Sequence, residues 1–162
     1  MRSAFVAAVL IACCVARCLG FPGANVTVAG ESGYAAFRIP GMATYIPRGA
    51  PRDTASMIVA VAEGRKFGCD DLLGQHDLML ARSLDGGVTW DGRHAPRTIV
   101  DAATGVDPGR GSNQSAVWDP TPVYDATTGV LFVFFAWSAT PAARLHGENH
   151  LFYVASPRGK RR

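Results

Sequence analysis

Ser83-Leu84-Asp85-Gly86-Gly87-Val88-Thr89-Trp90 joins a short polar turn to an aromatic residue. Asp85 can accept hydrogen bonds from backbone amides within such a turn, and the glycines tolerate the positive φ values that tight hairpin connections need. A tryptophan at the end of the turn can pack back onto the sheet. The segment therefore predicts a connection between two antiparallel strands.

Short apolar segments on both sides of this turn extend the same pattern. They are rich in β-branched and aromatic residues and alternate with clusters of Gly, Pro and Asp, and no long helical periodicity interrupts them. Because the run 130–136 is apolar at every position, we expect neighbouring layers to cover both of its faces. The chain is predicted to be all-β, as a sandwich, a barrel or a propeller. Expected strands are 36–39, 57–62, 77–82, 131–136 and 151–155, and expected turns are 47–53, 64–74, 85–87, 107–112 and 125–129.

Residues 1–20 have the pattern of a secretory signal peptide, with Arg2, an apolar run over 4–15 and small residues after it. The run is too short to cross a membrane, which takes roughly 20 apolar residues. Three of the four cysteines lie in this leader, so Cys69 remains alone and no internal disulfide is expected. Asn25 and Asn113 begin sequons and are candidates for N-glycosylation. These features predict the secretory pathway, with an extracellular or lysosomal destination.

The net charge of +3 comes from basic residues near the two ends of the chain. Without the leader and the basic tail at 158–162, acidic side chains outnumber basic ones. A nucleic-acid-binding surface is therefore not predicted, because it needs clustered Lys and Arg among the structured residues. The histidines and Cys69 show no ligand spacing, so no metal or cofactor is expected.

The turn at 83–90 resembles the Asp box, S-x-D-x-G-x-T-W, that is repeated in sialidases. In that family the box has a structural role at the edge of a propeller blade, away from the sugar, and it also occurs in propellers that are not sialidases. The resemblance therefore implies a propeller fold more strongly than it implies an activity. All five defining positions match: Ser83, Asp85, Gly87, Thr89 and Trp90.

A second segment, Phe37-Arg38-Ile39-Pro40, resembles the F/Y-R-I-P motif near the start of sialidase domains. In a strand, Phe37 and Ile39 would face one side and Arg38 the other, and Pro40 is expected to end the pairing because it lacks an N–H. The resemblance implies that Arg38 belongs to an arginine triad that binds the carboxylate of sialic acid. A planar guanidinium suits this role because it can form paired hydrogen bonds to a carboxylate.

The segment 62–71 is similar to the next sialidase region, with Arg65 at the position of a second pocket arginine and an aspartate after it. Asp71 is the preferred match for the acid/base catalyst because it lies twelve residues before Ser83, whereas the alternative, Asp70, lies five residues after Arg65. Such an aspartate protonates the departing glycosidic oxygen and later deprotonates water, which requires a raised pKa. The resemblance also implies a tyrosine nucleophile, assisted by a glutamate, in place of a second catalytic carboxylate.

Asp119 occupies the Asn/Asp position of a further sialidase-like segment, 118–132. By resemblance it lies beside the sugar pocket, in the region of the acyl-amino group. Alternatively, it caps the turn that it forms with Pro120. The sequence leaves both roles open.

Together, the motifs identify residues 21–157 as similar to the N-terminal part of a six-bladed sialidase β-propeller, about its first two blades. The tail at 158–162 stands where a second Asp box would be expected, which indicates a truncated chain or a changed reading frame. The implied function is exo-α-sialidase activity on glycoproteins, glycolipids such as gangliosides, or oligosaccharides, with membrane contact only through a glycolipid substrate. No segment supplies the tyrosine and glutamate, so the fragment is expected to be inactive alone. The alternative is a non-catalytic Asp-box propeller that acts as a secreted glycan- or protein-binding module.

Overall fold

The computed structural model describes residues 26–46, 56–91 and 96–156, and these residues form one sheet of seven strands with two short helices. The predictions for the leader 1–20, Asn25, the turn 47–53 and the tail 158–162 lie outside the described residues. No helix within the described ranges is long and apolar enough to span a membrane. In chain order the elements are η1 (Glu31–Gly33), β1 (Ala36–Tyr45), β2 (Met57–Arg65), β3 (His76–Ser83), β4 (Arg97–Val100), β5 (Ala116–Asp125), β6 (Val130–Ser138), α2 (Pro141–Leu145) and β7 (His150–Ala155).

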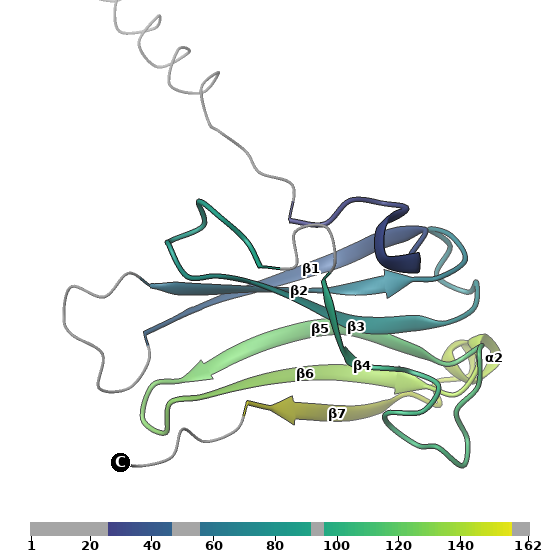
Figure 1. Ribbon diagram of the computed structural model, residues 1–162. Coiled ribbons are helices and arrows are strands. Elements are labelled where there is room, and N and C mark those ends of the chain that lie inside the picture. The colour runs from purple at the N-terminus through teal and green to yellow at the C-terminus, as the bar shows by residue number, and fades with distance from the viewer. Residues whose placement is uncertain (1–25, 47–55, 92–95, 157–162) are drawn as a thin grey trace, which may run out of the picture.

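The strands form two antiparallel meanders, which lie one above the other in Figure 1. The first meander pairs β1 with β2, β2 with β3 and β3 with β4; the second pairs β5 with β6 and β6 with β7. One parallel bridge, between His76 of β3 and Ala116 of β5, joins the two. The sheet remains open, with β1 and β7 at its two ends. The all-β prediction is confirmed.

Each of the five predicted strands is present, and each is longer than expected. β4, β5 and α2 have no counterpart among the predicted elements. The strand β5 was hidden by Pro120 and Pro122, which are unusual in a paired strand because proline cannot donate to the ladder. A register shift between Trp118 and Thr121 accommodates the first proline, and pairing with β6 then continues to Asp125.

The expectation that Pro40 ends strand pairing is wrong. The register between β1 and β2 shifts between Arg38 and Gly41, and pairing then continues to Tyr45. Ile39, within the shift, has a φ of 52°, so simple alternation of side chains is also broken here. The proline therefore marks a bulge inside a strand of ten residues.

The predicted turn 64–74 begins two residues too early, because Gly64 and Arg65 complete β2. Gly64 pairs with Phe37, and its missing side chain leaves room for close packing. A Cβ at this position would lie 2.6 Å from the Met79 side chain and 2.9 Å from the ring of Tyr34. Glycine here serves the close approach of neighbouring side chains rather than a turn.

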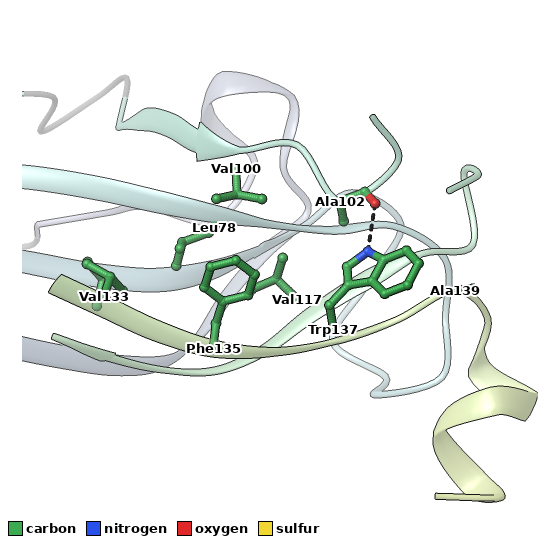
Figure 2. Close-up of a cluster of buried hydrophobic side chains, with 9 residues drawn as sticks. Leu78, Val100, Ala102, Val117, Val133, Phe135, Trp137 and Ala139 are labelled. Atoms are coloured by element: carbon green, nitrogen blue, oxygen red, sulfur yellow. Dashed lines mark hydrogen bonds between the residues drawn. The ribbon is translucent and has the colours of Figure 1, made fainter. Parts of the chain in front are cut away.

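The hydrophobic core lies between the two meanders (Figure 2). Trp137 of β6 also donates from Nε1 to the carbonyl oxygen of Ala102 at 2.9 Å, which ties the second meander to the segment after β4. Burial of this apolar surface is the main term that holds the meanders together. The core residues are Val61, Leu78, Val100, Ala102, Val117, Val133, Phe135, Trp137 and Ala139.

The opposite face of β6 is only partly covered, so the expectation of two covered faces for 130–136 is wrong among the described residues. Phe132 and Phe134 lie on this face, and the ring of Tyr153 in β7 packs 5.8 Å from each of them. Tyr153 is 61% exposed. We name these three side chains the open aromatic face.

The turn after β3 forms as the sequence predicts. Asp85 accepts hydrogen bonds from the backbone N–H of Thr89 at 2.9 Å and from its hydroxyl at 2.6 Å. The Ser83 hydroxyl donates to Asp85 at 2.8 Å, and Trp90 donates from Nε1 to the Gly87 carbonyl oxygen. The hydrogen bonds that Asp85 accepts, those from Thr89 foremost and then that from Ser83, lower the pKa of Asp85 to about 2.

Candidate functional site

Two arginines surround one carboxylate at the end of β2. Arg38 of β1 and Arg65 of β2 both place Nη1 near Oδ1 of Asp71, at 3.0 Å and 2.7 Å. Both also donate to the carbonyl oxygen of Cys69, at 3.0 Å and 2.6 Å. The loop between β2 and β3 is thus held through one backbone and one side-chain oxygen. We name Arg38, Arg65 and Asp71 the arginine–aspartate cluster.

The two arginines differ in accessibility. The Arg65 side chain is 1% exposed, whereas those of Arg38 and Asp71 are 43% and 48% exposed. Arg65 is therefore a buried support, and Arg38 is the cation that an external anion can reach. An exposed guanidinium with partly satisfied donors is suited to bind a carboxylate.

The buried carboxylate of Glu63 holds the Arg65 guanidinium in place. Its Oε2 accepts hydrogen bonds from Arg65 Nε at 3.0 Å and Nη2 at 2.5 Å, and its Oε1 accepts from the backbone N–H of Asp119 at 3.0 Å. Burial raises the pKa of Glu63, and the bonds from Asp119 and Arg65 oppose that effect. The sequence analysis gave Glu63 no role, although the i, i+2 spacing in a strand places it on the same face as Arg65. One buried carboxylate thus links the cluster to the second meander.

The structure separates the two candidate acid/base residues. Asp71 contacts both arginines, whereas Asp70 accepts a hydrogen bond from the Leu72 backbone N–H at 2.7 Å and caps its own turn. The pKa of Asp71 is lowered, first by the hydrogen bond from Arg65 and also by the charges of Arg65, Arg38 and Arg144. The expectation of a raised pKa is therefore wrong for this arrangement, because the cations favour the ionised carboxylate.

Asp119 contacts the site through its backbone. Its N–H binds Glu63, its carbonyl oxygen accepts from the Thr121 hydroxyl at 3.3 Å, and the residue itself is exposed. Its φ of 51° is unusual for a residue other than glycine. The contact with Glu63 brings the bulge of β5 to the cluster, while the role of the carboxylate stays a prediction.

Three residues that the sequence analysis did not assign complete the surroundings. Trp118 of β5 is buried and donates from Nε1 to the Ser138 hydroxyl at 2.7 Å, and its ring packs in a T-shaped arrangement with His76, with the ring centres 4.6 Å apart. Burial and the nearby Arg65 lower the pKa of His76 to about 4, so its ring is neutral at pH 7. The guanidinium of Arg144 lies 3.5 Å from the centre of a Trp118 ring. A Thr-Pro start at Thr140 was the only local signal for the helix that carries Arg144.

The remaining predicted residues lie apart from the cluster. Asn113 is exposed in the segment between β4 and β5. The turn at 83–90 begins at the last residue of β3, whereas the cluster lies near the first residue of that strand. Among the described ranges, no three His, Cys, Asp or Glu side chains are grouped as metal ligands.

Fold and site together define a β-propeller-type segment that presents arginines to a carboxylate. No protein-family model matches the chain. A curated sialidase from Bacteroides fragilis is 33% identical over 116 residues, which cover 72% of this chain and 19% of that protein. A solved Hadza microbial sialidase shares 28% identity with a TM-score of 0.54 over 70% of this chain and 20% of its own. Over the matched residues the chain is similar to sialidases in both sequence and fold.

Two further solved structures have the same fold at lower identity. An intramolecular trans-sialidase from Ruminococcus gnavus, in complex with oseltamivir carboxylate, is 23% identical with a TM-score of 0.52 over 71% of this chain and 24% of its own. A leech intramolecular trans-sialidase with bound 2,7-anhydro-Neu5Ac is 23% identical with a TM-score of 0.53 over 74% of this chain and 18% of its own. The chain therefore spans about a fifth of the length of these relatives.

Proposed function

We propose that the complete protein is an exo-α-sialidase that releases terminal sialic acid from glycoproteins, glycolipids or oligosaccharides. The observation that carries this proposal is the convergence of Arg38 and Arg65 on one carboxylate oxygen. Sialic acid itself carries a carboxylate, and a guanidinium pair binds such a group strongly and with defined geometry. The kinship with sialidases, and the sialic-acid-derived ligand in the leech structure, support a sialylated substrate.

In this proposal the substrate carboxylate replaces Asp71 on Arg38. Asp71 then loses a cation that keeps it ionised, and its pKa rises. A carboxyl group that holds a proton at that moment can donate it to the glycosidic oxygen. Binding of the substrate would thus itself raise the pKa of Asp71 and allow this residue to be protonated for catalysis.

The proposed reaction is a double displacement with retention. The bond between the anomeric carbon and the aglycone oxygen breaks as a tyrosine oxygen bonds to that carbon and gives its phenol proton to the glutamate, while Asp71 gives its proton to the departing oxygen. Water then attacks the carbon, Asp71 takes the water proton, the tyrosine–sugar bond breaks, and the glutamate returns the proton to the tyrosine oxygen. The glutamate-assisted tyrosine would come from outside this chain.

The contacts of the chain's own tyrosines support the view that none of them is the nucleophile. Tyr34 donates to Asp77, Tyr124 donates to the Ile46 carbonyl oxygen, and the Tyr45 ring packs against Tyr124. Tyr153 belongs to the open aromatic face. None of these contacts involves the arginine–aspartate cluster, so we expect the chain alone to bind sialic acid without cleaving sialosides.

The test measures ligand binding to the 162-residue chain. The chain is titrated in NMR experiments with N-acetylneuraminic acid and, separately, with the methyl ester of that acid. The ester keeps the sugar and removes the anionic carboxylate. We expect the free acid to bind about tenfold more tightly than the ester, which is the order of one charge-assisted hydrogen bond. Equal binding of both ligands, or binding of neither by the folded chain, would contradict the proposal.

Two arginine variants sharpen this test. Arg38→Lys keeps the charge and removes the planar fork, so we expect sialic acid binding to weaken about tenfold. Arg82→Lys is the matched control, because Arg82 is similarly exposed at 42% and pairs with Asp91 on another part of the sheet. Equal loss of binding in both variants would show that Arg38 has no special role.

The lowered pKa of Asp71 favours a second candidate, a propeller that binds acidic glycans without cleaving them. A binding module needs no proton from Asp71, whereas an acid catalyst must take up a proton before it can donate one. The two are separated by titrating the ¹³C carboxyl signal of Asp71 with and without sialic acid. A rise of its pKa on binding favours the enzyme, and an unchanged low pKa favours the binding module.

We propose in addition that the protein enters the secretory pathway and functions outside the cell or in a lysosome. The leader-like residues 1–20 and the exposed side chain of Asn113 support this route. Expression in a glycosylating host should give a chain that lacks the leader and carries an enzymatically removable glycan. Loss of that glycan in Asn113→Gln would assign it, whereas an intact leader on an intracellular chain would contradict the proposal.

A further inference from the structure

Arg144 of α2 joins the second meander to the loop that carries Asp71. Its guanidinium lies over Trp118 at 3.5 Å from the ring centre, and its Nη1 donates to the carbonyl oxygen of Asp71 at 3.4 Å. This hydrogen bond is long, but it connects residues 73 positions apart in the sequence. One half-buried side chain thus contacts both β5 and the loop between β2 and β3.

The orientation of Arg144 is fixed from both sides. On its own side, the Thr140 side chain caps α2 by accepting from the Ala143 backbone N–H at 3.1 Å. On the other side, the Trp118 indole is held by its hydrogen bond to Ser138 and by the edge of His76. A flat guanidinium stacks on a fixed aromatic face and keeps its edge donors free for a second partner.

The Asp71 loop therefore has two backbone anchors that come from different meanders. The Cys69 carbonyl oxygen is held by Arg38 and Arg65, and the Asp71 carbonyl oxygen is held by Arg144. The Asp71 side chain lies next to the second anchor, and its direction follows from where that carbonyl is held. If the second anchor were released, the carboxylate would depend on the cluster arginines alone.

We propose that Arg144 is a positioning residue for Asp71, acting through the backbone of the Asp71 loop and not through contact with the sugar. This inference rests on the proposed acid/base role of Asp71. Arg144 also adds a third positive charge near the Asp71 carboxylate, which Arg38 and Arg65 already contact. The other titratable groups nearby are Asp70 and Cys69 on the same loop and His76 at the start of β3. It would keep the loop in register while the substrate carboxylate displaces Asp71 from Arg38.

The test compares Arg144→Gln and Arg144→Lys with Arg97→Gln, which removes an equal charge from an exposed side chain on β4. The first readout is hydrogen exchange at the Leu72 and Leu73 amides, which lie directly after Asp71 and donate within the loop. We expect exchange about fivefold faster in Arg144→Gln, the change that corresponds to one lost hydrogen bond. Arg97→Gln should exchange as wild type does.

The second readout is the titration of the Asp71 carboxyl signal, which a role in helix packing alone would not change. We expect Asp71 to titrate at a higher pH in Arg144→Gln, because a nearby cation is lost. Arg144→Lys should restore the titration toward wild type, since it keeps the charge. Its loop should still exchange faster, because an ammonium cannot stack flat and donate sideways at once.

Unchanged exchange and titration in Arg144→Gln would overturn the inference, as would equal changes in Arg97→Gln. These measurements need no ligand, so they are independent of the sialic acid titration that tests the proposed function. If Arg144→Gln speeds amide exchange in the loop but the wild-type chain does not bind sialic acid, the positioning role of Arg144 stands and the sialidase proposal fails. If sialic acid binds to the wild-type chain but Arg144→Gln changes neither loop exchange nor the Asp71 titration, the sialidase proposal stands and the positioning role of Arg144 fails.

Discussion

Ile39 of β1 and Asp119 of β5 have nearly the same positive φ angle, and each is the fourth residue of its strand. Their φ angles are 52° and 51°, and each precedes a proline within a register shift. Residues before proline normally adopt extended conformations, so both positions carry backbone strain. The residue just before each of them, Arg38 or Trp118, belongs to the candidate site. The two meanders thus use one repeated bulge to place different side chains at the same end of the sheet.

Substitutions at Asp119 test this strain. Glycine tolerates a positive φ, whereas alanine does not, so Asp119→Gly should be more stable to unfolding than Asp119→Ala by about 1 kcal/mol. Elsewhere in a strand the order is the reverse, because glycine loses more conformational freedom on folding. Urea denaturation of the two variants measures the difference.

Val123 provides the control for that comparison. It is exposed on the same strand but lies in the regular register opposite Phe132. Here we expect Val123→Ala to be more stable than Val123→Gly by about 0.5 to 1 kcal/mol. The same order at both positions would show that the bulge is not strained.

Removing the Asp71 carboxylate should strengthen the binding of sialic acid to the chain. Asp71 occupies Arg38 as the substrate carboxylate would, and Asp71→Asn removes this competing anion. An exposed ion pair is worth about 1 kcal/mol or less, which predicts a gain of about two- to fivefold in affinity. NMR titration of both proteins with N-acetylneuraminic acid measures it. Weaker binding to Asp71→Asn would mean that Asp71 assists the ligand instead of competing with it.

The turn at 83–90 should lose its stabilising effect in acid. The folded state lowers the pKa of Asp85 from its ordinary 3.8 to about 2, so it favours the ionised form. The resulting stability is present above about pH 4 and is lost as the pH falls toward 2. We expect Asp85→Asn to be less stable than wild type at pH 7 and the gap to narrow at pH 2, as followed by urea midpoints. A gap of constant size would exclude this linkage.

Phe135 and Phe132 lie on opposite faces of β6 and form a matched pair. Phe135 is 2% exposed in the core, so Phe135→Ala should lower the free energy of unfolding by about 3 to 5 kcal/mol. Phe132 lies on the open aromatic face, so Phe132→Ala should lower it by about 1 kcal/mol. If Phe132→Ala lowered the free energy of unfolding as much as Phe135→Ala, and if its effect grew with protein concentration, a second copy of the chain would cover the open aromatic face in solution.

The sequence predicts much of the fold because strands and turns leave local signals. Short apolar and aromatic runs locate β1, β2, β3, β6 and β7, and the Asp85 turn is specified by hydrogen bonds between neighbours in the sequence. β5 was not predicted because it contains two prolines, and the bulge that accommodates Pro120 depends on pairing with β6. The partly bare face of β6 escaped because composition cannot show which neighbours a strand has.

The candidate site follows the same division. Motif resemblance singled out Arg38, Arg65 and Asp71, and the structure brings them within hydrogen-bond distance. Glu63 and Arg144 were missed because their partners, the backbone of Asp119 and that of Asp71, come from distant segments. The direction of the Asp71 pKa shift was also missed, since it depends on how many cations the fold places around one carboxylate.

The two anchors of the Asp71 loop also imply an order of assembly during synthesis. β1, β2 and the loop are translated before β5, β6 and α2, so the arginine–aspartate cluster can form while the second meander is still being made. Arg144 reaches the loop only after Trp118 and Ser138 have paired β5 with β6. The nascent chain would therefore bring Arg38 and Arg65 together first and fix the position of Asp71 last.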